Sequence, residues 1–127
     1  IKGLPQSARE QIILPGYVSD PQKKWLFSHC QAVLVPGMAE GFGLPVLEAF
    51  AAGGLVICSQ AGALPEIGKD GALYVSGPNP REWKTLMQSI MENKILTAEY
   101  QEQGKAILQE YTWERTAALT ARAFLTI

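Results

Sequence analysis

The chain has 127 residues, and its 11 basic and 12 acidic side chains give a formal net charge of −1 without a basic run. This balance argues against nucleic acid as the main partner. Hydrophobic residues make up 47% of the sequence, which suits one compact core rather than two domains. No stretch approaches the roughly 20 apolar residues that a transmembrane helix requires, and no signal peptide is visible.

The first 30 residues predict a helical turn, a strand and a helix. Residues 6–11 suit a short helical turn, and residues 12–14 are an apolar run that predicts a strand. Asp20, which precedes a proline, is expected to cap a helix that ends near residue 29. Because the chain begins with Ile1 rather than Met, we expect a fragment or a processed product.

A strand, a glycine-rich loop and a helix follow in the middle of the chain. Residues 32–35 are an apolar run typical of a buried parallel strand, and residues 45–52 predict a short helix. The glycines at 53–54 suit a left-handed helix end. In open α/β sheets, ligands bind where the carboxyl end of a strand meets the next helix. A helix start near Gly43 and Leu44 would also favour an anion there.

The rest of the chain predicts two more buried strands and about three helices. The strands are expected at residues 55–58 and 72–75. Asn79 begins the Asn-Pro-Arg-Glu order of a helix N-terminus, and Thr97 and Thr112 can each cap a later helix. Strands that alternate with helices predict an α/β fold with a parallel sheet and flanking helices.

Residues 40–48 read EGFGLPVLE and have the form E-x7-E. They resemble the donor-site signature of family 4 (group 1) of the retaining glycosyltransferases, which have the GT-B fold. The turn at 15–19, the strand and loop at 56–66 and the aromatic entry to the last helix at 110–113 are also similar to that family, in the same order. The resemblance covers roughly residues 12–127.

This resemblance implies the C-terminal half of a Rossmann-like, donor-binding domain. Residues 1–127 would form a single partial nucleotide-sugar-binding domain, and its first strands and the N-terminal acceptor domain would precede residue 1. An empty slot would then separate the strand at 12–14 from the strand at 32–35. Three outcomes stay open: the two strands pair directly, the missing segment binds as a separate piece and completes the sheet, or another chain completes it. Exposed strand edges favour the last, and with it self-association of the chain.

The resemblance also assigns roles to single residues. Glu48 would accept hydrogen bonds from the ribose hydroxyls of the donor, and Glu40 would act in catalysis beside the transferred sugar. Gly41 and Gly43 would let the backbone approach the diphosphate closely. The other donor-binding positions would be Phe42, Leu44 and, lining the base pocket, Tyr17 and Val18.

Each of these roles has a purely structural alternative. Glu48 could be an acidic residue of a first helical turn that the helix dipole stabilises, and Glu40 could be a solvated loop carboxylate. Phe42 could be a packing residue, and the two neighbouring glycines alone would suit a tight turn.

The chain is poor in metal-binding and redox side chains. Cys30 and Cys58 are isolated and His29 is the single histidine, which argues against a zinc site. We expect buried, reduced thiols in a cytoplasmic protein, and a core or interface histidine. The resemblance implies no cofactor and a metal-independent reaction, in which helix N-termini and basic side chains stabilise the departing diphosphate.

The function implied is the donor-binding part of a hexosyl-transferring enzyme. It would move a sugar from a nucleotide-diphosphate sugar to an unidentified acceptor with retention of configuration, in glycan or polysaccharide biosynthesis. The family's diphosphate-binding arginine and lysine would precede residue 1, so the chain alone is expected to be inactive. The alternatives are a truncated, non-catalytic nucleotide-binding or assembly module, and an epimerase of the same fold, which would call for more ionisable residues. Peripheral membrane contact through the missing domain stays open.

Overall fold

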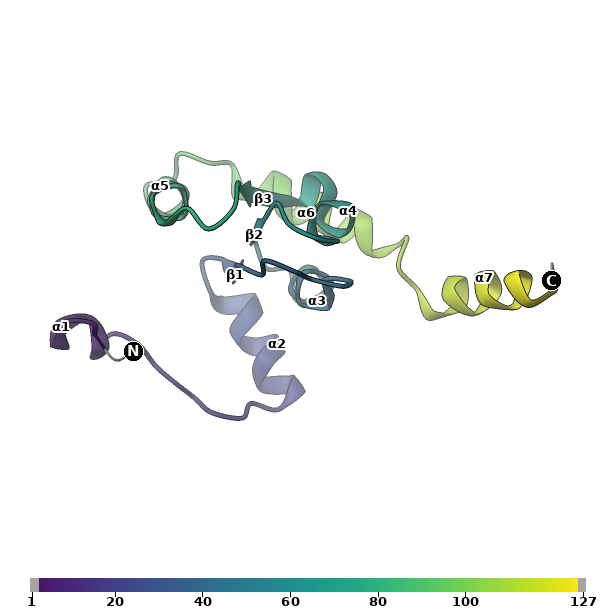
Figure 1. The fold of residues 1–127 in the computed structure, drawn as a ribbon, viewed down its shortest axis with the longest axis horizontal. Coiled ribbons are helices and arrows are strands. Elements are labelled where there is room, and N and C mark those ends of the chain that lie inside the picture. Colours follow the sequence, from purple (N-terminus) through teal and green to yellow (C-terminus); the bar gives the residue numbers. More distant parts are fainter. Residues whose placement is uncertain (1–2, 126–127) are drawn as a thin grey trace.

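The computed structural model describes residues 3–125, which contain a three-stranded parallel sheet (Figure 1). Strands β1 (Val33–Val35), β2 (Val56–Ser59) and β3 (Ala72–Val75) lie in the order β1-β2-β3. The register places Val56 of β2 beside Val33 of β1 and beside Ala72 of β3. The sheet confirms the predicted α/β class and all but the first of the predicted strands.

Helices connect and flank the strands, and the last part of the chain is helical as predicted. The helical elements are α1 (Gln6–Arg9), α2 (Asp20–His29), α3 (Leu44–Ala51), α4 (Leu64–Gly68), the 3-10 helix η1 (Lys69–Gly71), α5 (Pro80–Met91), α6 (Thr97–Leu108) and α7 (Trp113–Leu125).

Side chains and glycines at several helix ends act as the sequence predicts. The Asn79 side chain accepts a hydrogen bond from the backbone N–H of Arg81 at the start of α5. The Thr112 hydroxyl accepts one from the backbone N–H of Arg115 at the start of α7. At the end of α3, Gly53 has a φ of +75° and donates to the carbonyl of Phe50. Gly54 donates to the carbonyl of Ala49, which completes a Schellman motif.

Two predicted caps differ by one residue from those in the structure. The N-cap of α2 is Ser19 rather than Asp20, because Ser19 and Gln22 form a reciprocal capping box. The N-cap of α6 is Leu96, so Thr97 is the first residue of that helix and makes no capping hydrogen bond. Helix α2 nevertheless ends at residue 29, as predicted.

The strand predicted at residues 12–14 is absent, and this prediction was wrong. Ile13 is 85% exposed and Leu14 is 73% exposed, on an extended segment between α1 and α2. A strand is held by hydrogen bonds to a neighbouring strand, and none lies beside this segment within the described part of the chain. The direct pairing of residues 12–14 with β1 therefore does not occur.

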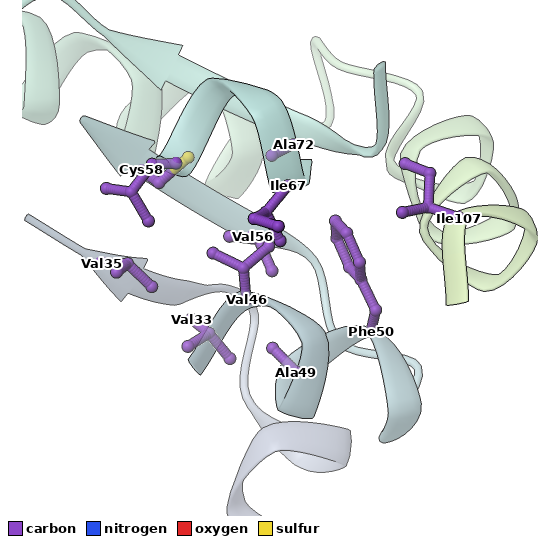
Figure 2. Close-up of a cluster of buried hydrophobic side chains, with 11 residues drawn as sticks. Val33, Val35, Val46, Ala49, Phe50, Val56, Cys58, Ile67, Ala72 and Ile107 are labelled. Carbon is purple, nitrogen blue, oxygen red and sulfur yellow. The ribbon is translucent and has the colours of Figure 1, made fainter. Parts of the chain in front are cut away.

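The core lies on both faces of the sheet. Because side chains alternate along a strand, Val56 and Cys58 point to one face and Ile57 to the other. The first face is covered by α3, α4 and α6, and Phe50 and Ile107 close it (Figure 2). The second face is covered by α5, whose Trp83, Leu86 and Ile90 have the spacing of one helix face.

Helix α2 is more exposed than its sequence predicts. His29 is exposed, so it is not a core residue. Its ring stacks on that of Trp25, which is 59% exposed, with 4.5 Å between the centroids. Phe27, by contrast, packs against the core on the face of the sheet that carries Val56 and Cys58. The thiols differ likewise, because Cys58 is buried as predicted whereas Cys30 is exposed.

Helix α7 extends away from the sheet and carries no buried residue among those described (Figure 1). Its apolar side chains face solvent, with Trp113 85% exposed and Phe124 75% exposed. The spacing of these residues gives α7 an apolar face, and within residues 3–125 this face is uncovered.

Candidate functional site

The predicted loop lies where the sequence places it, between the carboxyl end of β1 and the start of α3. Leu44 is the first helical residue, one position earlier than predicted, and Gly43 is its N-cap. Gly43 has a φ of +97°, which an L side chain rarely adopts, and a Cβ there would lie 3.4 Å from the Leu64 side chain. The chain therefore turns sharply against α4 before α3 begins, and the positive end of the α3 dipole faces the loop.

Two further glycines hold Glu40 in this loop. A Cβ at Gly62 would lie 2.5 Å from the Glu40 carbonyl oxygen, and a Cβ at Gly37 would lie 2.8 Å from the Glu40 Cγ. The backbone N–H of Ala63 donates to the Glu40 carbonyl at 3.1 Å. The buried Ser59 hydroxyl, at the end of β2, donates to the Gly37 carbonyl. The loops that follow β1 and β2 are therefore packed together around Glu40.

Glu48 lies in the second turn of α3 and is engaged by a lysine from α2. The Lys23 Nζ lies 2.8 Å from the Glu48 Oε1 and 3.4 Å from the Asp20 Oδ1. The hydrogen bond to Glu48 raises the pKa of Lys23, and Asp20 adds to this effect while desolvation opposes it. Sequence reasoning missed this pairing and placed Glu48 in a first turn. Residues 23 and 48 are far apart in the chain, so no local pattern joins them. The spacing of Asp20 and Lys23 predicts only that these two residues lie on one face of a helix.

Phe42 is half exposed and contacts an aromatic side chain from the junction between α6 and α7. Its ring is perpendicular to that of Tyr111, with 6.3 Å between the centroids. Beside this pair lies an open, mostly apolar cavity of about 630 Å³. Its lining combines the loop and α3 with the start of α7: Phe42, Leu44, Leu47, Glu110, Tyr111, Thr112, Trp113, Arg115, Thr116 and Leu119.

The remaining predicted positions lie at the surface. Tyr17 is 94% exposed and Val18 is half-buried, on the segment that leads into α2. Gly41 has open space around its Cα. The structure thus places residues 40–43 in the loop and Leu44 and Glu48 in α3. The roles proposed for these residues, and the role of Tyr17 and Val18 at a base pocket, stay predictions.

The described residues contain neither a cluster of metal ligands nor a membrane-spanning helix. Among residues 3–125, no three His, Cys, Asp or Glu side chains gather as metal ligands. No helix in the same range is long and apolar enough to cross a bilayer.

Comparison with known proteins identifies relatives over most of the chain. The family model described as "Glycosyl transferases group 1" matches residues 6–107. The O-antigen chain mannosyltransferase B of Escherichia coli is 33% identical over 114 residues, which are 86% of this chain and 29% of that protein. A serotype-specific mannosyltransferase, WbdA, of Escherichia coli is 34% identical over 123 residues, which are 92% of this chain and 14% of that protein.

A solved structure shares the fold. The crystal structure of Anabaena HepE in complex with UDP-glucose superposes with a TM-score of 0.75 at 20% identity, over 87% of this chain and 31% of HepE. The chain therefore spans less than a third of the length of each of these three proteins.

Proposed function

Because the chain belongs to the group 1 glycosyltransferases, we propose that it is the donor-binding part of an enzyme that transfers a sugar from a nucleotide-diphosphate sugar. The reaction proposed proceeds with retention of anomeric configuration, as in family 4, and serves polysaccharide biosynthesis. The observation that carries the proposal is the position of the loop with Glu40, between the carboxyl end of β1 and the start of α3, the helix that carries Glu48. Open α/β sheets bind their ligands at that edge.

Glu48 is the proposed ligand of the donor ribose. A carboxylate has about four lone-pair positions, and the bond from Lys23 to Oε1 leaves acceptor capacity for two vicinal hydroxyls. The Glu48 side chain is 42% exposed, so a nucleotide can reach it from solvent.

The diphosphate is proposed to lie over Gly41 and Gly43. Gly41 has no side chain to keep a phosphate away from the backbone, and α3 directs the positive end of its dipole toward this loop. Metal-independent transfer requires such fixed positive groups where charge develops on the leaving group. In this proposal the diphosphate is held without a metal ion.

Glu40 is the proposed catalytic carboxylate. The packing of its backbone against Gly62 and Ala63 fixes its place in the loop. A fixed carboxylate beside the sugar orients the sugar hydroxyls and stabilises positive charge that develops at the anomeric carbon.

The names of the relatives suggest donors for a first test. Mannosyltransferases are among the sequence relatives, and the HepE complex contains UDP-glucose. Isothermal titration calorimetry of the chain with GDP-mannose and UDP-glucose should show saturable binding of one of them. Mannose 1-phosphate and glucose 1-phosphate, which lack the nucleoside, should bind far more weakly. Absence of binding by either nucleotide sugar would contradict the proposal.

An assembly module is the second candidate function. The uncovered apolar face of α7 favours it, because exposed apolar surface of this kind usually contacts another protein surface. This candidate predicts association of the chain without any affinity for nucleotide sugars, so the same titration separates the two.

A further inference from the structure

We propose that Tyr111 is a positioning residue that holds the glycine loop through Phe42 and thereby sets the affinity of the chain for its ligand. This inference rests on the proposed function for the identity of that ligand. Tyr111 lies 69 residues after Phe42 in the chain (111 − 42) and reaches the loop from the junction between α6 and α7. It is therefore outside the segment to which ligand binding is assigned.

The middle of the glycine loop needs such a contact, because the packing of Glu40 and of Gly43 holds only the two ends of the loop. Of residues 41–43, Phe42 alone has a side chain, and glycine on both sides leaves the backbone wide conformational freedom. A Cβ at Gly41 would meet nothing within 4 Å, so that end of the loop is not packed. The contact of the Phe42 ring with Tyr111 can therefore fix the backbone at residues 41 and 42.

The Phe42 ring is 49% exposed. Tyr111 meets it edge to face, an arrangement that aromatic pairs prefer. The open cavity of about 630 Å³ adjoins the same ring. Without Tyr111, the Phe42 ring could rotate into that space, and the unpacked Gly41 would move with it.

Tyr111 is itself fixed against the body of the domain. Its hydroxyl lies 3.4 Å from the carbonyl of Glu66 in α4, and the Lys69 Nζ lies 5.8 Å from its ring centroid. Lys69 is in turn bonded to Glu110 at 2.7 Å. Helix α4 also supplies Leu64, which packs against Gly43. Tyr111 and the loop residue next to Phe42 therefore both contact α4.

The test compares Tyr111→Leu with a matched tyrosine variant. Tyr100→Leu is the control, because Tyr100 is also half-buried but packs against the opposite face of the sheet. Titration with GDP-mannose and UDP-glucose should show a rise in Kd of about three- to tenfold for Tyr111→Leu, the range expected for losing an aromatic pair. Tyr111→Phe keeps the ring and loses only the long 3.4 Å hydroxyl contact with Glu66, so its Kd should lie closer to wild type than that of Tyr111→Leu. Tyr100→Leu should leave the Kd unchanged.

A second readout does not depend on a ligand. Amide NMR relaxation of the free chain should show increased motion at Gly41, Phe42 and Gly43 in Tyr111→Leu and not in Tyr100→Leu. Phe42→Leu, at a residue that is 49% exposed and so tolerates replacement, should give the same Kd as Tyr111→Leu. The double variant should be no weaker than either single one, because both remove one contact.

The outcomes separate this inference from the proposed function. If the wild-type chain binds a nucleotide sugar and Tyr111→Leu and Phe42→Leu bind it equally well, Tyr111 does not position the loop. The same conclusion follows if Tyr100→Leu weakens binding as much as Tyr111→Leu, since the effect is then one of general stability. If Tyr111→Leu does not fold, the NMR relaxation of Phe42→Leu decides, because motion at Gly41 and Gly43 in the free chain does not depend on a contact between Phe42 and the ligand. If the wild-type chain binds neither sugar, the proposed function fails, and the role of Tyr111 in affinity fails with it.

Discussion

The ammonium group of Lys23 in α2 lies 2.8 Å from a carboxylate oxygen of Glu48 in α3. No local sequence pattern predicts this link between the two helices. The pair connects α2 to α3 on the side of the sheet where the ligand is proposed to bind. Both side chains are partly exposed, so water and salt screen the attraction. We therefore expect this ion pair to orient the Glu48 carboxylate and to contribute little to the stability of the fold.

The Lys23 pair predicts a defined pH dependence. A raised pKa means that the lysine stabilises the folded chain fully below its ordinary pKa of 10.5, and that this contribution is lost as pH rises through the higher folded value. The difference in unfolding free energy between wild type and Lys23→Met should therefore be constant near neutral pH and shrink at alkaline pH. Urea unfolding at several pH values measures it, with the exposed neighbour Lys24→Met as control. A difference that persists at strongly alkaline pH would argue against the pair.

The ribose assignment predicts a loss of affinity in Glu48→Gln. Replacing the charged acceptor by an amide should weaken nucleotide-sugar binding by about 1–3 kcal/mol. The fold should survive, because the side chain is 42% exposed. Glu99→Gln, an exposed glutamate in the first turn of α6, is the matched control and should bind as wild type does. Equal affinities for the Glu48 and Glu99 variants would remove the assignment.

The isolated chain is expected to transfer no sugar. It spans 29% of the length of O-antigen chain mannosyltransferase B, so most of such an enzyme is outside it. Losing a single group that stabilises charge in the transition state typically costs about 10²–10³-fold in rate. Release of nucleotide diphosphate from GDP-mannose and UDP-glucose should be assayed with and without sugar acceptors, so that hydrolysis is detected too. Turnover at the rate of an intact glycosyltransferase would contradict this expectation.

Gly104→Ala should destabilise the fold although the residue lies within a helix. In an exposed helix interior, this change normally stabilises by about 0.5–1 kcal/mol. Here a Cβ would lie 2.6 Å from the Phe50 ring, so we expect a loss of about 1–3 kcal/mol from overpacking. Denaturant unfolding measures the difference, with Gln103→Ala at the exposed neighbouring position as control. An increase in stability would show that α3 and α6 are packed less tightly than described.

Self-association is expected through the free edge of β1. In the described sheet β1 pairs with β2 on one side only, and Leu34 is 43% exposed. Unpaired strand edges recruit other strands, so sedimentation over about a hundredfold range of concentration should show a shift from monomer to dimer. Leu34→Lys, a charge on that edge, should reduce the shift, whereas Leu96→Lys, at an exposed position beside α6, should not. An ordered monomer throughout would contradict the expectation.

Sequence patterns predicted the elements that depend on local chemistry. The apolar runs gave β1, β2 and β3, and the caps at Asn79 and Thr112 marked the starts of α5 and α7. The failures concern tertiary context. Residues 12–14 have the composition of a strand but lack a neighbour to pair with. The spacing in α2 tells which residues share a face, but not whether another segment covers that face.

The same division holds for the candidate site. The position of the loop follows from the order of strand and helix, so Glu40 and Glu48 could be located from the sequence alone. The contacts of Lys23 with Glu48 and of Tyr111 with Phe42 join residues far apart in the chain. Charge and aromaticity suit many partners, and no local pattern selects among them.

The unequal exposure of the two thiols makes the chain suitable for single-site labelling. Cys58 is buried and desolvation raises its pKa to about 11, so it presents little thiolate at neutral pH. Cys30 is exposed at the end of α2, the helix that carries Lys23. A maleimide dye should therefore attach at Cys30 without mutagenesis. Its fluorescence would report in real time whether α2 moves when a nucleotide binds at Glu48, the partner of Lys23.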